Sequence, residues 1–573
     1  MKRNFTFLIV LPFLLLPVSS DFQSGIPSDA AEMYSIRQNP KLKKESKKYI
    51  DAVRTFADNA IKNGKDVYGV KKTPLFVDGL NIEKMEPVKW KFPEGEEWVL
   101  VDIGNQQNFY RTLCGLSGLT NNPKYKNAAV EAVKYSFSNL RYGKLLAWGG
   151  HIAYNATADS VVYAPDKGKV QELKSHYPFY DLMWEVDPAE TKIMIENIWN
   201  SHILDWNNLD FNRHGTPRPM GTLWKSEYNA GEPFFWGKGL TFKNAGSDLY
   251  YAAALLSKYT NDDDPLVWAK RLANRYVETR NKKTGLSGFQ FSQAAGSWCD
   301  GPSIRGDRAQ YQYGEDFKDH FVVEGTLFPC YGNTPYFKSE LCSFYIADLL
   351  GEKGKEFKNW AIEEITSWAK SSYRRSDNSF VPMLTDGTSM EGYVIKKPGY
   401  FGPQGRVLTA GWAGAGELWI YARATQATDD TLIWNMARRI ATANKFGDIG
   451  KNPATPPSLN FNTDNSDYQT LFAFLSLFQK TKNPQFLEMA DAIGKNILKD
   501  FYKNGYFMAD KNSTYTRFDN VEALALLSLA EALENSTGKV PLYPGGRGFF
   551  ASAYGDKGHK YDNAFIYSLT EGE

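Results

Sequence analysis

The sequence contains little histidine, little cysteine and almost no net charge. Its 573 residues include six His and four Cys, and the net charge at pH 7 is +2. Proteins that bind nucleic acids usually carry a strongly basic stripe, so this balance argues against that class. An acidic ligand is still compatible with it if Lys and Arg side chains gather in one cleft, because a cleft focuses their field.

Long apolar runs are also absent after the N-terminus. Lys2 and Arg3 precede an apolar stretch over 5–16, and the small residues Val18 and Ser20 follow. This order predicts a signal peptide over 1–20, cleaved after Ser20, and therefore an exported chain. The stretch is too short to cross a membrane, and no later stretch qualifies, so we expect no membrane span. No Cys lies near the cleavage point, so a lipid anchor is not expected.

The four cysteines are far apart along the chain. An exported protein permits disulfides, but a fold of this size does not need them. The sequence cannot assign their pairing. They are Cys114, Cys299, Cys330 and Cys342.

A helical pattern recurs along the chain. Four segments begin with a polar turn that carries Asn or Asp and continue with apolar residues at three- and four-residue spacing. They start at Leu119, Lys258, Thr425 and Lys480, and a looser copy starts at Leu350. Helical hairpins cannot bury their apolar faces alone, so they must stack or close into a ring.

We therefore predict an all-α fold, an α/α toroid that forms one catalytic domain over 21–573. An α-solenoid that binds a protein partner is the alternative. No low-complexity linker divides the chain, and short segments from Trp90 and from Phe507 are expected to form β-hairpins on the rim. The predicted helices cover 43–63, 123–140, 187–206, 246–259, 264–280, 337–351, 354–372, 411–426, 429–444, 466–481, 484–500 and 519–534.

Long loops rich in glycine and aromatic residues separate these helices. They cover 143–182, 211–245 and 282–336. Loops of this length inside a compact domain are usually functional. Aromatic residues make up 15% of the chain, and amphipathic rings suit surfaces that hold sugar rings as well as cores.

Histidine and acidic residues gather in the first two of these loops and the helix between them. Two imidazoles and a carboxylate, with coordination positions left open, make a plausible catalytic site for a divalent metal. A single His is more often a packed or surface residue, and His202 on its predicted helix could be purely structural. Glu172 and His176 would share a face if they lay on a helix. The candidates are His151, Glu172, His176, Asp181, His202, Asp205, Asp210 and His214.

The segments ELKSHYPFYDLMWEVDP and LDFNRHG resemble polysaccharide lyase family 2, the pectate lyases built on a ring of helical hairpins. The resemblance is firm over about 145–245. It implies that a divalent metal, manganese most readily and cobalt or nickel otherwise, is held by His151, Glu172 and His214. It also implies that Arg213, directly before the last ligand, abstracts the proton. The expected activity is metal-assisted β-elimination on polygalacturonate or oligogalacturonides, in the periplasm or after secretion. We expect a monomer.

Further residues are candidates for holding the acidic chain. Bidentate Arg suits carboxylates best, and aromatic faces could line the cleft. Ordinary loop charges and core packing are the alternatives for each residue taken singly. The candidates are Arg305, Arg308, Lys396 and Arg406 for the uronates, and Trp148, Trp224, Phe235 and Trp236 for the sugar rings.

Two rival functions stay open on the sequence alone. A hydrolase on a similar helical toroid would act on unsaturated uronides with paired carboxylic acids and water, and Asp205 and Asp210 keep it possible. A protein that captures oligogalacturonides without cleaving them is the other. Lyases make a conjugated double bond, hydrolases add water, and binding proteins do neither.

Overall fold

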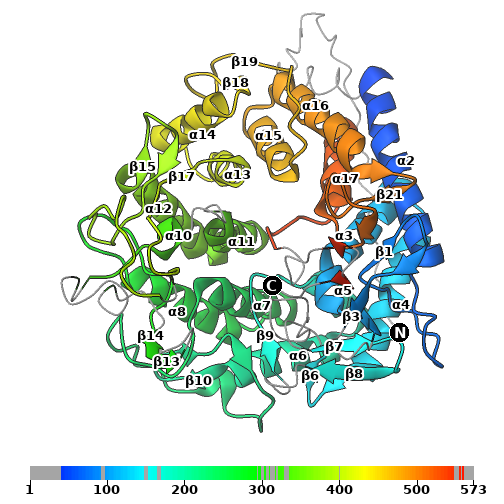
Figure 1. Ribbon diagram of the computed structural model, residues 1–573, viewed down its shortest axis with the longest axis horizontal. Helices are drawn as coiled ribbons and strands as arrows, with labels where there is room; N and C mark the ends of the chain where they lie inside the picture. The colour runs from blue at the N-terminus through cyan, green and yellow to red at the C-terminus, as the bar shows by residue number, and fades with distance from the viewer. Residues whose placement is uncertain are drawn as a thin grey trace, which may run out of the picture.

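The computed structural model describes residues 40–91, 97–147, 152–163, 170–292, 295–297, 302–304, 309, 317, 320–327, 334–398, 401–546, 554–555 and 558–559. Within this part of the chain the helices form a closed ring of antiparallel hairpins (Figure 1). The inner helices are α3 (Gln107–Thr120), α5 (Tyr180–Val186), α7 (Lys243–Thr260), α11 (Thr334–Leu350), α13 (Ala415–Ala424), α15 (Tyr468–Thr481) and α17 (Val521–Leu533). The predicted all-α toroid is confirmed.

An outer helix packs against each inner one. The outer helices are α2 (Pro40–Asn63), α4 (Lys124–Asn139), α6 (Pro188–His202), α8 (Asp264–Glu278), α12 (Lys355–Ser371), α14 (Thr431–Ala443) and α16 (Pro484–Phe501). The first of them, α2, packs on the last inner helix, α17, and so closes the ring. Phe56 of α2 contacts the rings of Phe109 and Phe507 edge-on at centroid distances of 5.9 and 5.3 Å.

Inner and outer helices differ in burial for a simple reason. Inner helices are enclosed on most sides, and Ala, Leu and Tyr on all faces of α7 are buried. Outer helices such as α14 and α16 keep one apolar stripe inward and a polar stripe toward water. The predicted caps also hold, since Asp430 accepts the Leu432 N–H at 2.8 Å and Asn483 accepts the Gln485 N–H at 3.0 Å.

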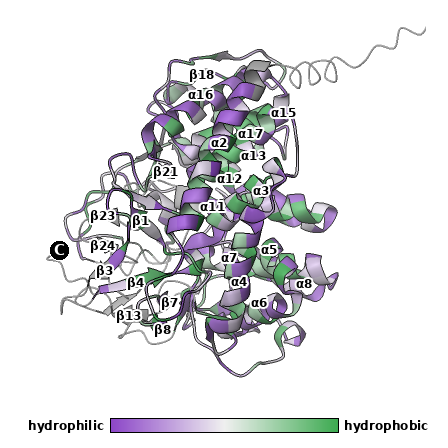
Figure 2. Ribbon diagram, turned by 90° about the vertical axis from the view of Figure 1, so that its right-hand side faces the viewer, coloured by the Kyte–Doolittle hydropathy of each residue, from purple (hydrophilic) through white to green (hydrophobic). Residues whose placement is uncertain are grey.

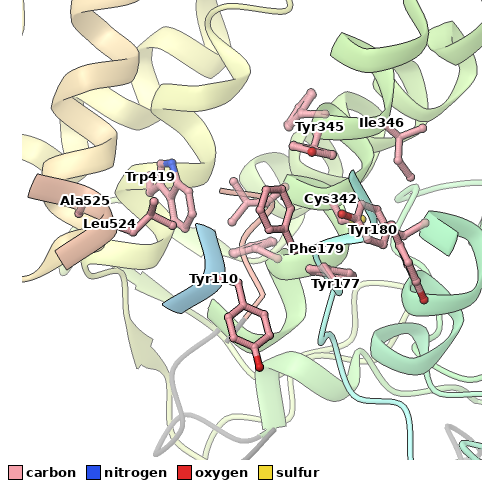
Figure 3. Close-up of a cluster of buried hydrophobic side chains, with 14 of the residues drawn as sticks. Tyr110, Tyr177, Phe179, Tyr180, Cys342, Tyr345, Ile346, Trp419, Leu524 and Ala525 are labelled. Atoms are coloured by element: carbon pink, nitrogen blue, oxygen red, sulfur yellow. The ribbon is translucent and has the colours of Figure 1, made fainter. Parts of the chain in front are cut away.

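The middle of the ring is filled with side chains. Aromatic and aliphatic residues of the inner helices and of the segments beside them meet there (Figure 3). Tyr251 of α7 contacts Tyr177, Tyr180 and Tyr345 at centroid distances of 5.4, 5.6 and 5.9 Å. Residues 537–546, after α17, run back into the ring, and Tyr543 stacks on Trp419 at 5.6 Å. The ring is therefore a packed core.

Short antiparallel strands join the helices, most of them at one end of the ring (left in Figure 2). The predicted hairpin near Trp90 is β3 (Lys89–Lys91) with β4 (Glu97–Val101), in a sheet with β7 (Ile152–Asn155) and β8 (Ser160–Tyr163). The segment after Phe507 contains β22 (Tyr515–Arg517), which pairs mainly with β1 (Gly79–Asn81). Two further pairs flank α6 in the sequence: β9 (Gln171–Glu172) with β12 (His214–Gly215), and β10 (Ile203–Asp205) with β11 (Asp210–Phe211).

None of the helices in the described ranges combines the length and the apolar character that a membrane crossing requires. Cys114 and Cys342 carry free thiols.

Candidate active site

The candidate site begins with a two-residue antiparallel ladder. Strand β9 pairs with β12 so that His214 lies opposite Glu172 and Gly215 opposite Gln171. Residues directly opposite in such a ladder project from the same face. The Nε2 atom of His214 therefore lies 3.6 Å from Oε1 of Glu172. One further bond, from the Leu173 N–H to the Arg213 carbonyl at 3.0 Å, extends the pairing.

Arg213 contacts both of these side chains. Its Nη2 donates to Oε1 of Glu172 in a close ion pair, and its Nε donates to Nε2 of His214 at 3.4 Å. The guanidinium also lies over the ring of Phe242, 5.5 Å from its centroid. The side chain of Glu172 is fully buried, whereas those of Arg213 and His214 are 19% and 26% exposed. A ligand would meet the basic groups first, with the carboxylate behind them.

The electrostatics keep the buried carboxylate charged. Burial by itself raises the pKa of Glu172, but the positive charges of Arg213 and Lys174 and contacts with His214 lower that pKa well below its usual range. A buried anion of this kind needs a partner. A cation, either Arg213 or a metal ion, is the natural partner for it.

Two other histidines of the predicted cluster are fully buried. Nδ1 of His202 lies 2.8 Å from the Asn212 carbonyl, and its Nε2 lies 3.4 Å from Oε1 of Gln171. Burial lowers the pKa of His202 to about 3 and that of His176 well below its usual range. Both rings are neutral at pH 7, and the position of His202 behind β12 agrees with the structural role considered for it.

The acidic candidates of the cluster other than Glu172 are engaged by neighbouring groups. Asp210 accepts the N–H groups of Lys238 and Gly239 at 2.9 and 3.2 Å, and Asp205 accepts the Asn207 N–H at 2.9 Å. Asp181 accepts the Tyr259 hydroxyl at 2.8 Å.

The remaining predicted residues fall into two groups. Trp148, His151, Arg305 and Arg308 lie outside the described residues. Of the others, Trp236 is 50% exposed and Lys396 is exposed, whereas Nη1 and Nη2 of Arg406 donate to the carbonyls of Phe401 and Leu327 at 2.6 and 2.7 Å. Trp224 packs against Trp199 at 5.1 Å, and Phe235 lies 6.1 Å from Phe291.

The donor chemistry of the ladder fits a divalent first-row metal. Glu172 and His214 supply one carboxylate and one imidazole whose donor atoms are close enough to share an ion. Among the described residues, no group of three or more His, Cys, Asp and Glu side chains is placed to hold a metal. If a metal at this site took a third protein ligand of these types, that ligand would lie outside the described ranges, as His151 does.

The comparisons of sequence agree on one family. The family model described as "Periplasmic pectate lyase" matches residues 73–553. The pectate disaccharide-lyase of Dickeya dadantii (strain 3937) is 29% identical over 562 residues, which cover 92% of this chain and 98% of that protein.

Solved structures with a similar course of the chain are more distant. The cellobiose 2-epimerase from Spirochaeta thermophila DSM 6192 has a TM-score of 0.41 and 10% identity, with 87% of this chain and 98% of that chain covered. A GH76 α-mannanase from Bacteroides thetaiotaomicron has a TM-score of 0.39 and 10% identity, with 88% and 98% covered.

The first prediction concerns the packing behind β12. A Cβ at Gly215 would lie 2.5–2.7 Å from ring atoms of the buried His202. Gly215→Ala must therefore displace the strand that carries His214, and we expect the free energy of unfolding to fall by about 1–3 kcal/mol in urea titrations. The control is Gly221→Ala, whose Cβ would meet its nearest atom at 3.5 Å. Equal stability of the two variants would contradict this packing.

Proposed function

The chain belongs to the periplasmic pectate lyase family, and from that membership we propose that it cleaves polygalacturonate or oligogalacturonides by metal-assisted β-elimination at Glu172, Arg213 and His214. It is accordingly a polysaccharide lyase. The observation that carries the choice of site is the register of β9 and β12. That register places a buried carboxylate opposite an imidazole, with Arg213 contacting both.

The chemistry of elimination defines what the site must do. A base takes the proton on the carbon α to the uronate carboxylate. The electron pair of that C–H bond becomes a carbon–carbon double bond, the bond from the β carbon to the glycosidic oxygen breaks, and that oxygen leaves and is protonated. Negative charge builds on the carboxylate as the proton leaves, so the site needs positive charge beside the carboxylate and a base on the face that carries the proton.

His151, Glu172 and His214 would hold the metal, which we propose to be manganese, with cobalt or nickel as substitutes. When bound, the ion would act as a Lewis acid on the uronate carboxylate and would disfavour a positive charge on the neighbouring guanidinium. The carboxylate and imidazole at 3.6 Å support this assignment. Two imidazoles and one carboxylate suit several first-row ions, and affinity alone does not choose among them.

Arg213 is proposed as the base. A free arginine has a pKa of about 12.5–13.8, so the base role needs surroundings that disfavour the protonated form. Arg213 is partly exposed and pairs with Glu172, on the side from which a ligand reaches the cluster. If Glu172 held the metal, the guanidinium would lose its carboxylate partner and could turn toward the substrate.

Other residues are proposed to hold the remaining uronates and sugar rings. Exposed Trp236 and Lys396 can meet a polymer directly, and the partly exposed Arg406 holds two carbonyls of the surrounding loops. Arg305, Arg308 and Trp148 complete the proposed set.

The family is described as periplasmic, which supports export of the chain. We propose that residues 1–20 are a signal peptide, that the mature enzyme acts in the periplasm or outside the cell, and that it is a monomer.

The second prediction concerns the substrate. Methyl esterification removes the charge that the metal and the arginines would bind, so unesterified polygalacturonate should be cut far faster than highly methylated pectin. The ultraviolet absorbance of the conjugated double bond in the products measures both rates. Equal rates on the two polymers would contradict a mechanism that holds the carboxylate.

The third prediction concerns the metal. A strong chelator should abolish activity, and manganese, cobalt or nickel should restore it. His151→Ala and His214→Ala should each lower the metal content of the purified protein. His320→Ala is the matched control, because His320 is a partly exposed histidine that pairs with Asp386 at 3.2 Å and is not among the proposed ligands. Full metal retention in both site variants would place the metal elsewhere, with His176 and His202 the next candidates.

The fourth prediction tests whether Arg213 is the base or only binds a carboxylate of the substrate. If Arg213 is the base, the rate rises with pH above neutrality, and Arg213→Ala loses about 10²–10⁴-fold in kcat while keeping its metal. Arg213→Lys should keep residual turnover with a shifted pH profile, since the pKa of free Lys is about 10.4.

Arg218→Ala is the control for that series. Arg218 lies on the same loop as Arg213, and it donates to the carbonyl of Ser201, in α6, at 2.8 Å. It should keep its kcat. If Arg213→Ala left kcat unchanged and only raised KM, Arg213 would bind the substrate equally well in the ground state and in the transition state. It would then have no part in proton transfer.

A further inference from the structure

The chain leaves β9 through a strained turn. Ser175 has φ +58° and Tyr177 has φ +44°, so two non-glycine residues lie in the left-handed region within three positions. Such residues cost roughly 1–3 kcal/mol each and persist only where the surrounding structure holds them. The turn begins immediately after Glu172 and Leu173. Whatever holds the turn therefore also sets the end of the strand that carries the buried carboxylate.

One side chain holds this turn from the direction of α7. Oδ2 of Asp248 accepts the Lys174 N–H at 2.8 Å, and its Oδ1 accepts the N–H groups of His176 and Tyr177 at 2.7 and 2.9 Å. Asp248 is 2% exposed. Successive backbone N–H groups that converge in this way form a concave site for an oxygen acceptor. Burial raises the pKa of Asp248 to about 7, and the bonds from these N–H groups act against that rise.

The opposite side of the turn is packed as tightly. A Cβ at Gly546 would lie 2.7 Å from the His176 carbonyl oxygen and 3.0 Å from that of Ser175. Nη2 of Arg111 donates to the Tyr177 carbonyl at 2.7 Å. The N–H groups of the turn therefore face α7, where three bind Asp248 and that of Ser175 donates to the Asn244 carbonyl at 2.8 Å. The carbonyls of the turn face α3 and the segment after α17. The turn cannot relax without losing one of these contacts.

Helix α7 also reaches the other strand of the site. Phe242, the residue before α7, lies under the guanidinium of Arg213, and the Arg213 N–H donates to the Leu240 carbonyl at 3.3 Å. The same helix thus fixes the turn after Glu172 through Asp248 and borders Arg213 at its start. It links the two strands whose register forms the site.

We propose that Asp248 is a positioning residue for the elimination: it binds the backbone of 174–177 and thereby fixes the orientation of Glu172 relative to Arg213 and His214. This inference rests on the proposed function of that cluster. Asp248 touches neither substrate nor metal, and its effect passes through the turn.

The test uses Asp248→Asn and Asp248→Ala in the full-length enzyme. If the Asn oxygen keeps the N–H groups of His176 and Tyr177, its NH₂ group faces the Lys174 N–H, donor against donor. We expect faster amide hydrogen exchange over 173–177, a kcat lowered about 10–100-fold with KM little changed, and a manganese Kd weakened about 10–100-fold, the scale typical of groups that support a ligand. The Ala variant should show the larger effects, and Asn covers the case in which Ala does not fold.

Asp78→Asn is the matched control. Asp78 is 4% exposed, and its two oxygens accept the Asp102 N–H at 3.0 Å and the Asn105 side-chain amide at 3.3 Å, in the segment before α3. Its substitution should lower the urea midpoint as Asp248→Asn does, with exchange over 173–177, kcat and manganese Kd unchanged.

Two results would overturn the proposal. One is an Asp248→Asn enzyme with native exchange over 173–177 and native kcat. The other is an Asp78→Asn enzyme that loses kcat and manganese affinity equally, which would mean general destabilisation. Measurements of unsaturated product and of manganese binding by the wild-type enzyme test the proposed function separately. If it made unsaturated product without binding manganese, only the metal assignment would fail, and exchange and kcat would still decide the role of Asp248. A wild type that made no unsaturated product would overturn both proposals.

Discussion

The pairing of β9 with β12 is the constraint on which the site depends. Two residues that are 42 positions apart become neighbours only in this register, and a slip of one residue would turn one of the two side chains to the opposite face. A ladder of two residue pairs is too short to hold its register alone. Neighbouring groups help to hold this register. The buried ring of His202 lies against Gly215, and the turn after Glu172 is bound to Asp248.

The ring of helices explains why such a short ladder can be rigid. Strand β12 follows α6 and β11, whereas β9 precedes α5. Residues beside the two strands, Arg213 and Ser175, donate their N–H groups to the carbonyls of Leu240 and Asn244, before and at the start of α7. The packed centre of the ring makes α5 and α7 difficult to displace, since Tyr177 and Tyr180 both contact Tyr251. Long loops are thus anchored at a few points on rigid elements. This arrangement allows loop residues to hold a defined geometry.

Much of the fold could be predicted from periodicity because outer helices such as α14 and α16 have distinct polar and apolar faces. The predicted ranges match the outer helices within a few residues, apart from α6, which ends at His202 and not near Trp206. Helix α3 was missed. Its sequence gives little helical signal, because it begins with the polar residues Gln107 and Asn108, which are buried, and it contains Gly115 and Gly118. These glycines are required by close packing against a segment distant in the sequence. A Cβ at Gly118 would lie 2.3 Å from the Lys539 carbonyl oxygen.

The grouping of the candidate residues was predicted in part. The contacts that sequence could not predict are again those between residues far apart in the chain. The resemblance pointed to Glu172, Arg213 and His214, and the structure brings these three together. Spacing alone suggested that Glu172 and His176 could share a helical face, but the segment is a strand followed by a left-handed turn. Asp210 could not be separated from a catalytic acid by sequence, because its partners, the N–H groups of Lys238 and Gly239, lie 28 and 29 residues away.

If the β9–β12 ladder is the metal-binding and catalytic centre, a metal ion must bind at Glu172 and His214. Anomalous diffraction at the manganese edge, from crystals of the full chain soaked in manganese, tests this most directly. We expect a single strong peak within bonding distance of the Glu172 carboxylate and of His214 Nε2, with a further contact from His151 and with Arg213 released from Glu172. A peak elsewhere, or an intact Arg213–Glu172 ion pair in manganese-loaded crystals, would contradict this assignment.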